Sequence, residues 1–559
     1  MVATVTPRPL SNPEIAHRLV AYAHQLRSKG ENPYKVRAYQ RGAQTIKGLR
    51  ESVDQLVRAG ADLTRFPAIG RGLAAALREI VFSGTLGQLE LPLTAAPPEV
   101  AAVSEYPQLD AQRVARVFKR LGISTVAELK RKFEDGAIRA AFGLRMEDHF
   151  RHAFRESTLI LLDDADALAG EVREFLLARC GARRVEYAGD LRRRVEAVEE
   201  IALVVETDDF PQLRDRLAKF RGGIDLREGA NRHATFQLPG SVRVAVHAAT
   251  AGDWGTALVI ATGSAAHLKE LRKAGALQRR ARTEEAAYTS VGLAWVPPEL
   301  REGRDEVALA ARDALPTLVT LDDIRGDLHM HTTASDGVDT IEAMAAAARE
   351  RGYEYIGITD HSQSLKIARG VSVAALWTQI RRIDRLNARL DGIRILKSAE
   401  VDILADGSLD YPDDLLAELD YTICSIHSKF RLGKKEQTER ILRAMDHPAF
   451  TILGHATGRL ILHRSGYEID LPRLISHAKA RRCCFEINAD PDRLDLVPDD
   501  VRLVAQAGVK VAIGTDAHRA AGLDYMRCGI DVARRAGLEK SSVLNTATLA
   551  RLLRNLRRP

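Results

Sequence analysis

The sequence predicts a multidomain protein with an α-helical N-terminal region, an α+β middle and a C-terminal α/β barrel. The chain of 559 residues is too long for one hydrophobic core. From about residue 322 onward, short apolar runs alternate with helical patterns, which favours a parallel sheet. Residues 1–80 instead contain helical patterns separated by a tight glycine turn.

The apolar runs of the C-terminal part end in polar residues. They read GDLHMHTTASDG, YEYIGITDHS, IRILKSAEVDIL, LDYTICSIHS, FTILGHATGR, CCFEINADP and VKVAIGTDAH. Helical patterns such as TIEAMAAAARERG separate several of them, so the strands should be parallel. Parallel barrels carry their chemistry at the carboxyl ends of their strands, where these polar residues fall.

Nine of these polar residues have side chains that commonly bind metals. They are His329, His331, Asp336, His361, Glu400, His427, His455, Asp516 and His518. A single histidine in an apolar context is usually structural, but repeated placement at strand ends is hard to explain by chance. Imidazole and carboxylate groups suit zinc, manganese or iron, and nine exceed what one ion needs. Two or three ions could activate a water and clamp a phosphoester.

These motifs resemble the PHP (polymerase and histidinol phosphatase) phosphoesterase domain. HMHTTASDG, TDHS, AEVDI, SIHS, GHATGR and GTDAH carry the resemblance. It implies a distorted (βα)7 barrel that binds two or three divalent ions, with Mn²⁺ or Zn²⁺ expected. The implied ligand sets are His329, His331, Glu400 and Asp516 for one ion, Glu400, His427 and His455 for a second, and Asp336, His361 and His518 for a third. Glu400 would bridge two ions and take part in catalysis.

Four further polar residues lie beside this predicted site. Arg459 and Arg464, in GRLILHRSGY, could bind a substrate phosphate through their planar guanidinium groups, with Arg459 as a catalytic residue. An exposed arginine is equally compatible with simple solvation. Asn488 and Arg493, in EINADPDRLDL, could line the pocket or fix a loop.

Composition and charge narrow the class of protein. No apolar stretch reaches 18 residues and the N-terminus has no signal core, so we expect a cytoplasmic, nucleoid-associated protein without a membrane partner. Five cysteines without a CxxC pair suit a reducing compartment. Residues 1–80 hold 13 of the 82 Lys and Arg but only 6 of the 75 Asp and Glu, which leaves 69 of each elsewhere. The excess positive charge therefore lies at the N-terminus and indicates a polyanion partner.

The basic N-terminal segment also contains a motif. RFPAIGRGLAAALREIVFSG reads as helix, tight turn and helix, and resembles a helix-hairpin-helix. The resemblance implies that the turn amides bind a DNA backbone phosphate without reading bases. The DNA-binding residues expected are Pro67, Ile69, Gly70, Arg71 and Gly72.

The middle of the chain resembles the rest of a family X DNA polymerase. YAGDLRRRVEAVEEIALVV, ATGSAAHLKELR and VGLAWVPPELREGRDE carry this resemblance. With both ends included, it implies the domain order of bacterial family X polymerases. The expected domains are a helix-hairpin-helix DNA-binding domain at 1–90, a fingers-like helical region at 91–160, a palm-like nucleotidyltransferase domain at 161–250, a thumb-like domain at 251–321 and the PHP domain at 322–559.

The polymerase-like part departs from its family where nucleotidyl transfer needs metal ligands. That reaction uses three carboxylates, two of them in a D-x-D pair on one strand. The pair falls at Glu200 and Ala202, and the third position holds Ala245. Asp190 replaces the serine of a turn that contacts the triphosphate, and its charge would repel that ligand. Ala76 stands where the family has its lyase lysine, so we expect polymerase and Schiff-base lyase activity to be absent.

Together, these resemblances imply a metal-dependent 3′–5′ exonuclease or phosphoesterase of DNA repair, acting on ends, gaps or single strands. Three alternatives stay open. The protein could be an active repair polymerase with an exonuclease, a small-molecule phosphatase of the histidinol-phosphatase type, or a DNA-end-binding scaffold without activity. The basic N-terminal segment favours DNA over a small molecule, and the complete ligand set argues against the scaffold.

Overall fold

The computed structural model describes residues 10–83, 109–154 and 159–556, apart from short gaps inside these ranges. The chain forms two compact units. One comprises residues 1–160, 167–187 and 198–250, and the other comprises residues 161–166, 188–197 and 251–559. No helix in the described ranges is long and apolar enough to cross a membrane.

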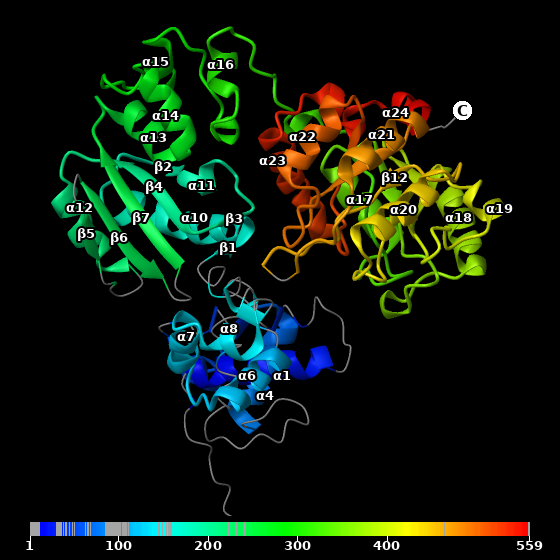
Figure 1. Ribbon diagram of the computed structural model, residues 1–559, viewed down its shortest axis with the longest axis horizontal. Helices are drawn as coiled ribbons and strands as arrows, with labels where there is room; N and C mark the ends of the chain where they lie inside the picture. Colours follow the sequence, from blue (N-terminus) through cyan, green and yellow to red (C-terminus); the bar gives the residue numbers. More distant parts are fainter. Residues whose placement is uncertain are drawn as a thin grey trace, which may run out of the picture. The chain divides into compact units, whose positions relative to one another are not determined.

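The N-terminal region is helical, as the sequence predicts (Figure 1). Its helices are α1 (Asn12–Ser28), α3 (Val53–Arg58), α4 (Arg71–Ser83), α6 (Ala111–Leu121), α7 (Val126–Glu134) and α8 (Ala137–Phe142). The first three enclose a core that includes Ile15, Leu63 and Leu77. The Ser52 hydroxyl accepts a hydrogen bond from the Gln55 amide at the start of α3, which satisfies a helix-terminal donor.

A five-stranded mixed sheet has the strand order β2-β4-β7-β6-β5. Its central strands β4 and β7 are parallel, whereas β7, β6 and β5 pair antiparallel. The strands are β2 (Arg184–Ala188), β4 (Glu200–Glu206), β5 (Arg227–Gly229), β6 (His233–Leu238) and β7 (Val242–Ala249), with helices α10 (Leu162–Arg179) and α12 (Phe210–Leu217). Apolar residues such as Leu203 and Val246 are fully buried, so the central strands carry the core of this layer.

The second unit contains short helices and a barrel. The short helices are α11 (Gly189–Arg192), α13 (Trp254–Thr262), α14 (Ala265–Lys273), α15 (Glu284–Thr289) and α16 (Glu306–Ala310). Buried Val259, Leu271 and Tyr288 form their core. The Ser264 hydroxyl accepts from the His267 amide and caps α14.

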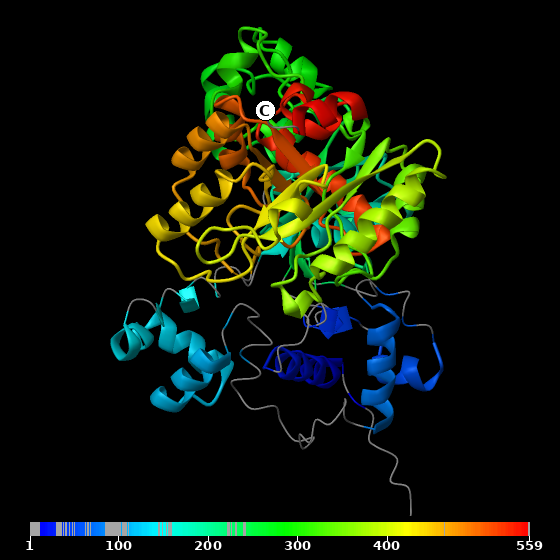
Figure 2. The same ribbon diagram turned by 90° about the vertical axis from the view of Figure 1, so that its right-hand side faces the viewer.

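Seven parallel strands form the barrel, and each pairs with its neighbours in chain order. They are β8 (Gly326–Asp327), β9 (Tyr355–Ile358), β10 (Arg394–Asp402), β11 (Tyr421–Ser425), β12 (Ile452–Leu453), β13 (Cys484–Asn488) and β14 (Val511–Gly514). The main helices between and after them are α17 (Ile341–Glu350), α18 (Val373–Asn387), α19 (Asp413–Leu416), α20 (Lys434–Met445), α21 (Leu471–Arg481), α22 (Pro498–Gln506), α23 (Met526–Arg535) and α24 (Leu549–Leu556). Strands and helices alternate around the barrel (Figure 2), which confirms the predicted α/β barrel.

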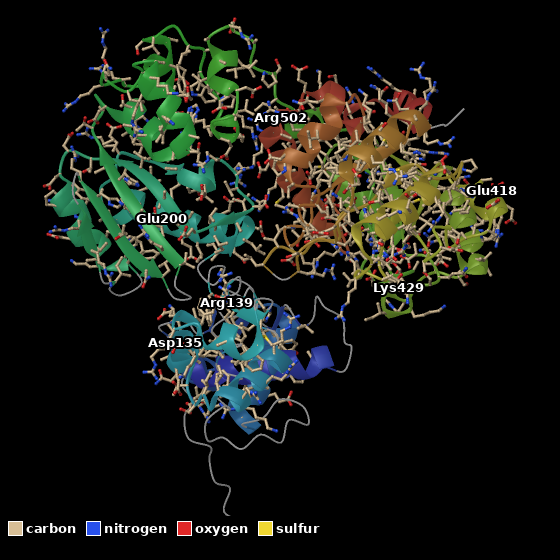
Figure 3. All side chains as sticks on the ribbon, viewed as in Figure 1. Asp135, Arg139, Glu200, Glu418, Lys429 and Arg502 are labelled. Atoms are coloured by element: carbon tan, nitrogen blue, oxygen red, sulfur yellow. The ribbon has the colours of Figure 1, made fainter. Side chains whose placement is uncertain are left out.

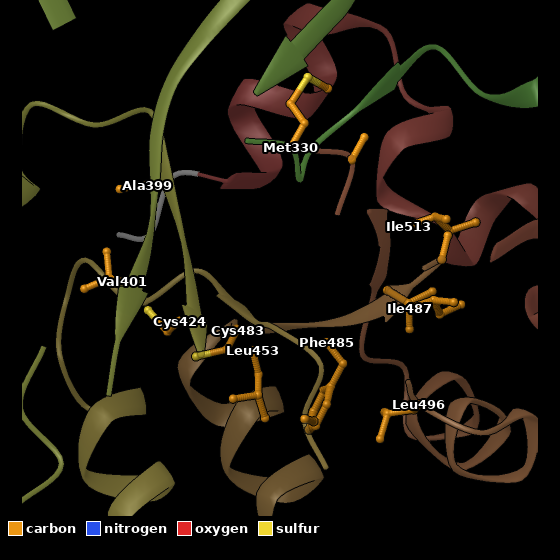
Figure 4. Close-up of a cluster of buried hydrophobic side chains, with 14 of the residues drawn as sticks. Met330, Ala399, Val401, Cys424, Leu453, Cys483, Phe485, Ile487, Leu496 and Ile513 are labelled. Atoms are coloured by element: carbon orange, nitrogen blue, oxygen red, sulfur yellow. The ribbon is translucent and has the colours of Figure 1, made fainter. Parts of the chain in front are cut away.

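Side chains alternate across the barrel wall. Ala399 and Val401 of β10 and Phe485 and Ile487 of β13 belong to the large apolar core shown in Figure 4. Glu400 lies between the first two residues and therefore faces the barrel interior. The pleat thus allows one strand to carry both core packing and a carboxylate of the site.

The first and last strands approach each other at both ends of the barrel. At the carboxyl end, the Asp516 amide donates to the His329 carbonyl at 2.9 Å and the His331 amide to the Ala517 carbonyl at 2.8 Å. At the opposite end, the fully buried Asn545 side chain donates to the carbonyls of Gly326 and Ile513 at 2.8 and 3.0 Å. Its oxygen also accepts from the Ile513 amide at 3.0 Å. Asn545 therefore replaces strand pairing where β8 and β14 do not meet.

We predict that Asn545→Ala lowers the melting temperature of the barrel. The substitution leaves three buried backbone groups without partners, and each costs about 1–3 kcal/mol. Differential scanning calorimetry of the full chain would measure the change. Asn387→Ala is the control, because Asn387 makes two hydrogen bonds to Ile395 in a part-buried position away from the closure. Equal effects of the two variants would contradict the role of Asn545.

Candidate metal centre

The structure brings the nine metal-binding side chains expected from the sequence together at the carboxyl end of the barrel. Eight of them follow strands β8, β9, β11, β12 and β14, and Glu400 lies within β10. They are His329, His331, Asp336, His361, Glu400, His427, His455, Asp516 and His518. The carboxyl ends of parallel strands meet at one edge, so residues distant in sequence become neighbours.

Glu400 lies at the middle of this cluster and is only 1% exposed. Its Oε1 is 2.8 Å from His455 Nε2 and 3.3 Å from His427 Nε2. Its Oε2 is 2.7 Å from His361 Nδ1 and 3.6 Å from His329 Nε2. The two carboxylate oxygens thus face different histidines, as a bridging ligand would.

Three groups of residues place donor atoms within 4.8 Å of one another: His331, Asp336, His361 and His518; His329, His331 and Asp516; and His361, Glu400 and His427. The second group also approaches Glu400, since His331 Nε2 is 3.6 Å from Glu400 Oε2. The groups overlap with the three ligand sets implied by the PHP resemblance. His331 and His361 each contribute to two groups, so the cluster is continuous.

Several buried atoms of the cluster lack a hydrogen bond of acceptable geometry within the described ranges. They include His329 Nε2, both ring nitrogens of His331, and Glu400 Oε2. Buried polar atoms are normally satisfied, and these donor types are the usual ligands of divalent transition metals. The residues present therefore fit divalent metal ions.

The charges of the cluster shift its ionisation strongly. Burial opposes ionisation of Glu400, but surrounding histidines, His361 first, hold its pKa well below the usual range. Burial also opposes the protonation of His427, but Glu400 and Asp402 raise its pKa to about 10. Against the same effect of burial, Glu486 and Asp516 raise the pKa of His329 well above its usual value. Protons and divalent cations therefore compete for the same donor atoms.

Carboxylates outside the nine fix the orientation of two histidine rings. His329 Nδ1 is 2.5 Å from Glu486 Oε1, and His427 Nδ1 is 2.5 Å from Asp402 Oδ1. Each contact leaves Nε2 directed at Glu400. The Glu486 side chain fits because position 514 is a glycine. A Cβ at Gly514 would lie 2.4 Å from Glu486 Oε1, which is too close for any other residue.

Sequence reasoning missed Glu486 and Asp402, although each had a signal. Glu486 is a charged residue inside the apolar run CCFEIN, and Asp402 lies two positions after Glu400 on the same strand. Side chains two positions apart on a strand share a face, so both could have been assigned to the barrel interior.

Two of the nine candidate ligands have backbones in the left-handed region. His455 has a φ of 23° and Asp516 a φ of 54°. Such conformations cost about 1–3 kcal/mol in residues other than glycine and persist where their surroundings fix them. Hydrogen bonds from the His455 amide to Glu486 and from the Asp516 amide to the His329 carbonyl fix these two.

The other polar residues predicted beside the site make defined contacts. The Asn488 side chain donates to Asp516 Oδ2 at 3.1 Å, and Arg493 Nε lies 3.5 Å from the same oxygen. Arg459 donates to the Arg493 carbonyl at 2.8 Å and pairs with Glu196 at 2.8 Å. Arg464 donates to the Gly458 carbonyl at 2.6 Å. The phosphate contact expected for Arg459 and Arg464 stays a prediction.

The residues of the polymerase-like site lie on the mixed sheet and on α11. Ala202 of β4 is directly opposite Ala245 of β7, and both are buried. Glu200 (Figure 3) is opposite Arg243, whose Nε lies 2.5 Å from Glu200 Oε2. Asp190 pairs with Arg193 on its own turn.

The predicted DNA-binding turn is described in part. Ile69 is buried at 3% exposure, its amide donates to the Phe66 carbonyl at 3.2 Å, and α4 begins at Arg71. A Cβ at Gly70 or Gly72 would meet nothing within 4 Å, so the backbone there is accessible to a ligand. Pro67 and the Arg71 side chain lie outside the described residues.

A parallel barrel with clustered histidines and carboxylates at its carboxyl end defines the PHP class of proteins. Comparison with known proteins agrees, because a PHP domain model matches residues 327–489 and a helix-hairpin-helix domain model matches residues 10–86. The chain is 33% identical over 562 residues to the DNA polymerase/3′-5′ exonuclease PolX of Bacillus subtilis, which covers 96% of this chain and 97% of that protein. The chain therefore belongs to the bacterial PolX family.

Two other matches concern the barrel. A probable phosphatase of Thermoanaerobacter is 29% identical over 234 residues, which is 39% of this chain and 89% of that protein. The structure of histidinol phosphate phosphatase from Lactococcus lactis, complexed with zinc, L-histidinol and phosphate, matches with a TM-score of 0.30 and 15% identity over 38% of this chain and 94% of that one.

We predict that Glu486→Gln weakens Mn²⁺ binding by about 10–100-fold, the usual cost of losing a carboxylate that orients a metal-bound histidine. The amide keeps the shape but loses the charge next to His329. Isothermal titration with Mn²⁺ measures the affinity. Glu354→Gln is the control, since Glu354 pairs with Arg325 at an exposed position. Unchanged affinity in Glu486→Gln would contradict the orienting role.

Proposed function

We propose that this protein is a metal-dependent DNA phosphoesterase that acts as a 3′–5′ exonuclease in repair, and that its polymerase-like part no longer synthesises DNA. The observation that carries the proposal is the cluster of nine potential metal ligands at the carboxyl end of the barrel, Glu400 among them, of which six are buried and three are partly buried. We expect Mn²⁺ or Zn²⁺, in two or three ions, held by the nine candidate residues; eight of them fall in the three overlapping groups, and the ninth, His455, lies 2.8 Å from Glu400. Bound there, such ions would supply water activation and charge neutralisation at a phosphoester.

The residues of the chain have separate tasks in this proposal. Glu400 would hold metal ions through its two carboxylate oxygens, while Asp402 and Glu486 keep the histidine rings in one orientation. The accessible backbone at Gly70 and Gly72 would bind DNA phosphates without reading bases. The name of the Bacillus subtilis relative, which covers nearly all of this chain, supports DNA as the substrate.

Two alternatives have support of their own. The probable phosphatases that match the barrel favour a small phosphomonoester. The relative's name also includes DNA polymerase, which favours retained synthesis. The basic N-terminal segment argues against a small phosphomonoester, because such a substrate needs no basic surface. The ion pair of Glu200 with Arg243 argues against retained synthesis.

Loss of synthesis is supported by the charges at the polymerase-like positions. Two neighbouring strand positions that would supply carboxylates hold Ala202 and Ala245, so neither offers a ligand. The remaining carboxylate, Glu200, is paired with Arg243. On α11, Asp190 is paired with Arg193. This pairing neutralises the positive charge of Arg193, which would otherwise be available to a triphosphate.

We predict that the full-length protein shortens 3′-ended DNA with added Mn²⁺ and that His329→Ala with His331→Ala lowers the rate at least about 10³-fold. Loss of both imidazoles opens metal coordination positions. Digestion of 5′-labelled DNA on denaturing gels measures the rate. The control is His447→Ala with His477→Ala, two histidines that pair with carboxylates elsewhere. Undiminished activity in the first double variant would place the active site elsewhere.

We also predict no primer extension with Mg²⁺ or Mn²⁺ and all four nucleotides, because one arginine-paired carboxylate cannot position two ions. The assay uses the His329→Ala, His331→Ala variant, so that degradation does not hide synthesis. Extension that survives Glu200→Ala would show that the synthetic carboxylates lie elsewhere in the chain.

A further inference from the structure

The segment 188–197 packs in the same compact unit as the barrel, although it belongs to the polymerase-like part of the sequence. Arg194 pairs with Asp166 at 2.7 Å and with Asp531 of α23 at 2.8 Å. The Arg193 carbonyl accepts from Arg535 Nη1 at 2.9 Å. These contacts hold the segment against the barrel and fix the position of Glu196, which lies within the segment.

Glu196 contacts the barrel through Arg459. Its Oε1 is 2.8 Å from Arg459 Nη1, and the two side chains are 25% and 15% exposed. The same guanidinium donates through Nε to the Arg493 carbonyl at 2.8 Å and through Nη2 to the Leu494 carbonyl at 2.5 Å. One rigid planar group thus connects Glu196 to two successive peptide units of the loop 490–495.

The loop 490–495 contacts the metal centre directly. Arg493 Nε is 3.5 Å from Asp516 Oδ2, and the Asn488 side chain donates to the same oxygen at 3.1 Å. The Asn488 amide in turn donates to the Asp495 carbonyl at 2.6 Å. Leu494 has a φ of 40°, a conformation that surrounding contacts must impose. Both Leu494 and its neighbour Arg493 bind Arg459 through their carbonyls.

We infer that Glu196 is a positioning residue for hydrolysis at the metal centre, because it orients Arg459 and through it the loop that carries Arg493. The inference deepens the proposed phosphoesterase function and rests on it. It also assigns Arg459 a positioning role in place of direct phosphate binding. A turn that resembles a triphosphate site would then serve the hydrolytic site of the same chain.

The test compares Glu196→Gln with Glu299→Gln in the full-length protein. Glu299 likewise pairs with an arginine, Arg534 of α23, at 2.7 Å, but among the described residues this pair makes no hydrogen bond or ion pair with the loop 490–495. The readouts are kcat and KM for 3′-ended single-stranded DNA and for bis(p-nitrophenyl) phosphate with Mn²⁺. Hydrogen–deuterium exchange of residues 488–496 provides a readout that does not depend on activity.

We expect Glu196→Gln to lower kcat about tenfold on both substrates and to speed exchange in residues 488–496, since small misplacement of a site is costly. Glu299→Gln should change neither. Combined with Arg459→Met, Glu196→Gln should add no further loss, because both act through one contact. Equal behaviour of the two glutamine variants, or an additive double variant, would overturn the inference. If the wild type hydrolyses no DNA, the proposed function fails, and unchanged exchange in Glu196→Gln still overturns the inference separately.

Discussion

The burial of the Glu400 carboxylate is the constraint on which the rest of the barrel depends. A charge that is 1% exposed is costly unless opposite charges or metals surround it. Its neighbours His361, His427 and His455 come from the ends of three different strands. No local segment could provide them together, so the compensation exists only when the barrel closes. Assembly of the site therefore depends on closure of the barrel.

Closure relies on side chains where strand pairing is short. The strands β8 and β12 have two residues each, so few ladder hydrogen bonds hold them. Asn545 satisfies backbone groups of Gly326 and Ile513 at one end. At the other end, Thr515 pairs with buried Asp327, which lies beside the His329 amide. Burial raises the pKa of Asp327 to about 6, so hydrogen bonds from these groups only partly offset its desolvation. The same contacts thus join the strands and fix the backbone of the candidate ligand His329.

The sequence predicted the barrel and the side chains that cluster at its carboxyl end, because both follow from local patterns. An apolar run that ends in histidine indicates a strand and a potential metal ligand together, which is why His361 and His427 could be assigned to the cluster without a structure. Glu486 was missed because its role depends on which face of β13 meets the interior. The partner of Arg459, Glu196, lies 263 residues away, a separation that no local pattern spans. The turn at Pro67 stays a prediction, because that residue lies outside the described ranges.

The arginines of the segment 188–197, which resembles a triphosphate-binding turn, are paired with internal carboxylates. Arg192 makes a bidentate pair with Glu284 at 2.8 Å, and together with Arg301 it lowers the pKa of this carboxyl to about 2 despite burial. Arg194 is similarly bound to Asp531. A triphosphate would have to displace these carboxylates, and each buried acid left behind would be an uncompensated charge. Carboxylates of the same chain are thus paired with Arg192 and Arg194, whose charges an anionic substrate would need. The pairing of Arg194 with Asp531 also holds the segment against the barrel.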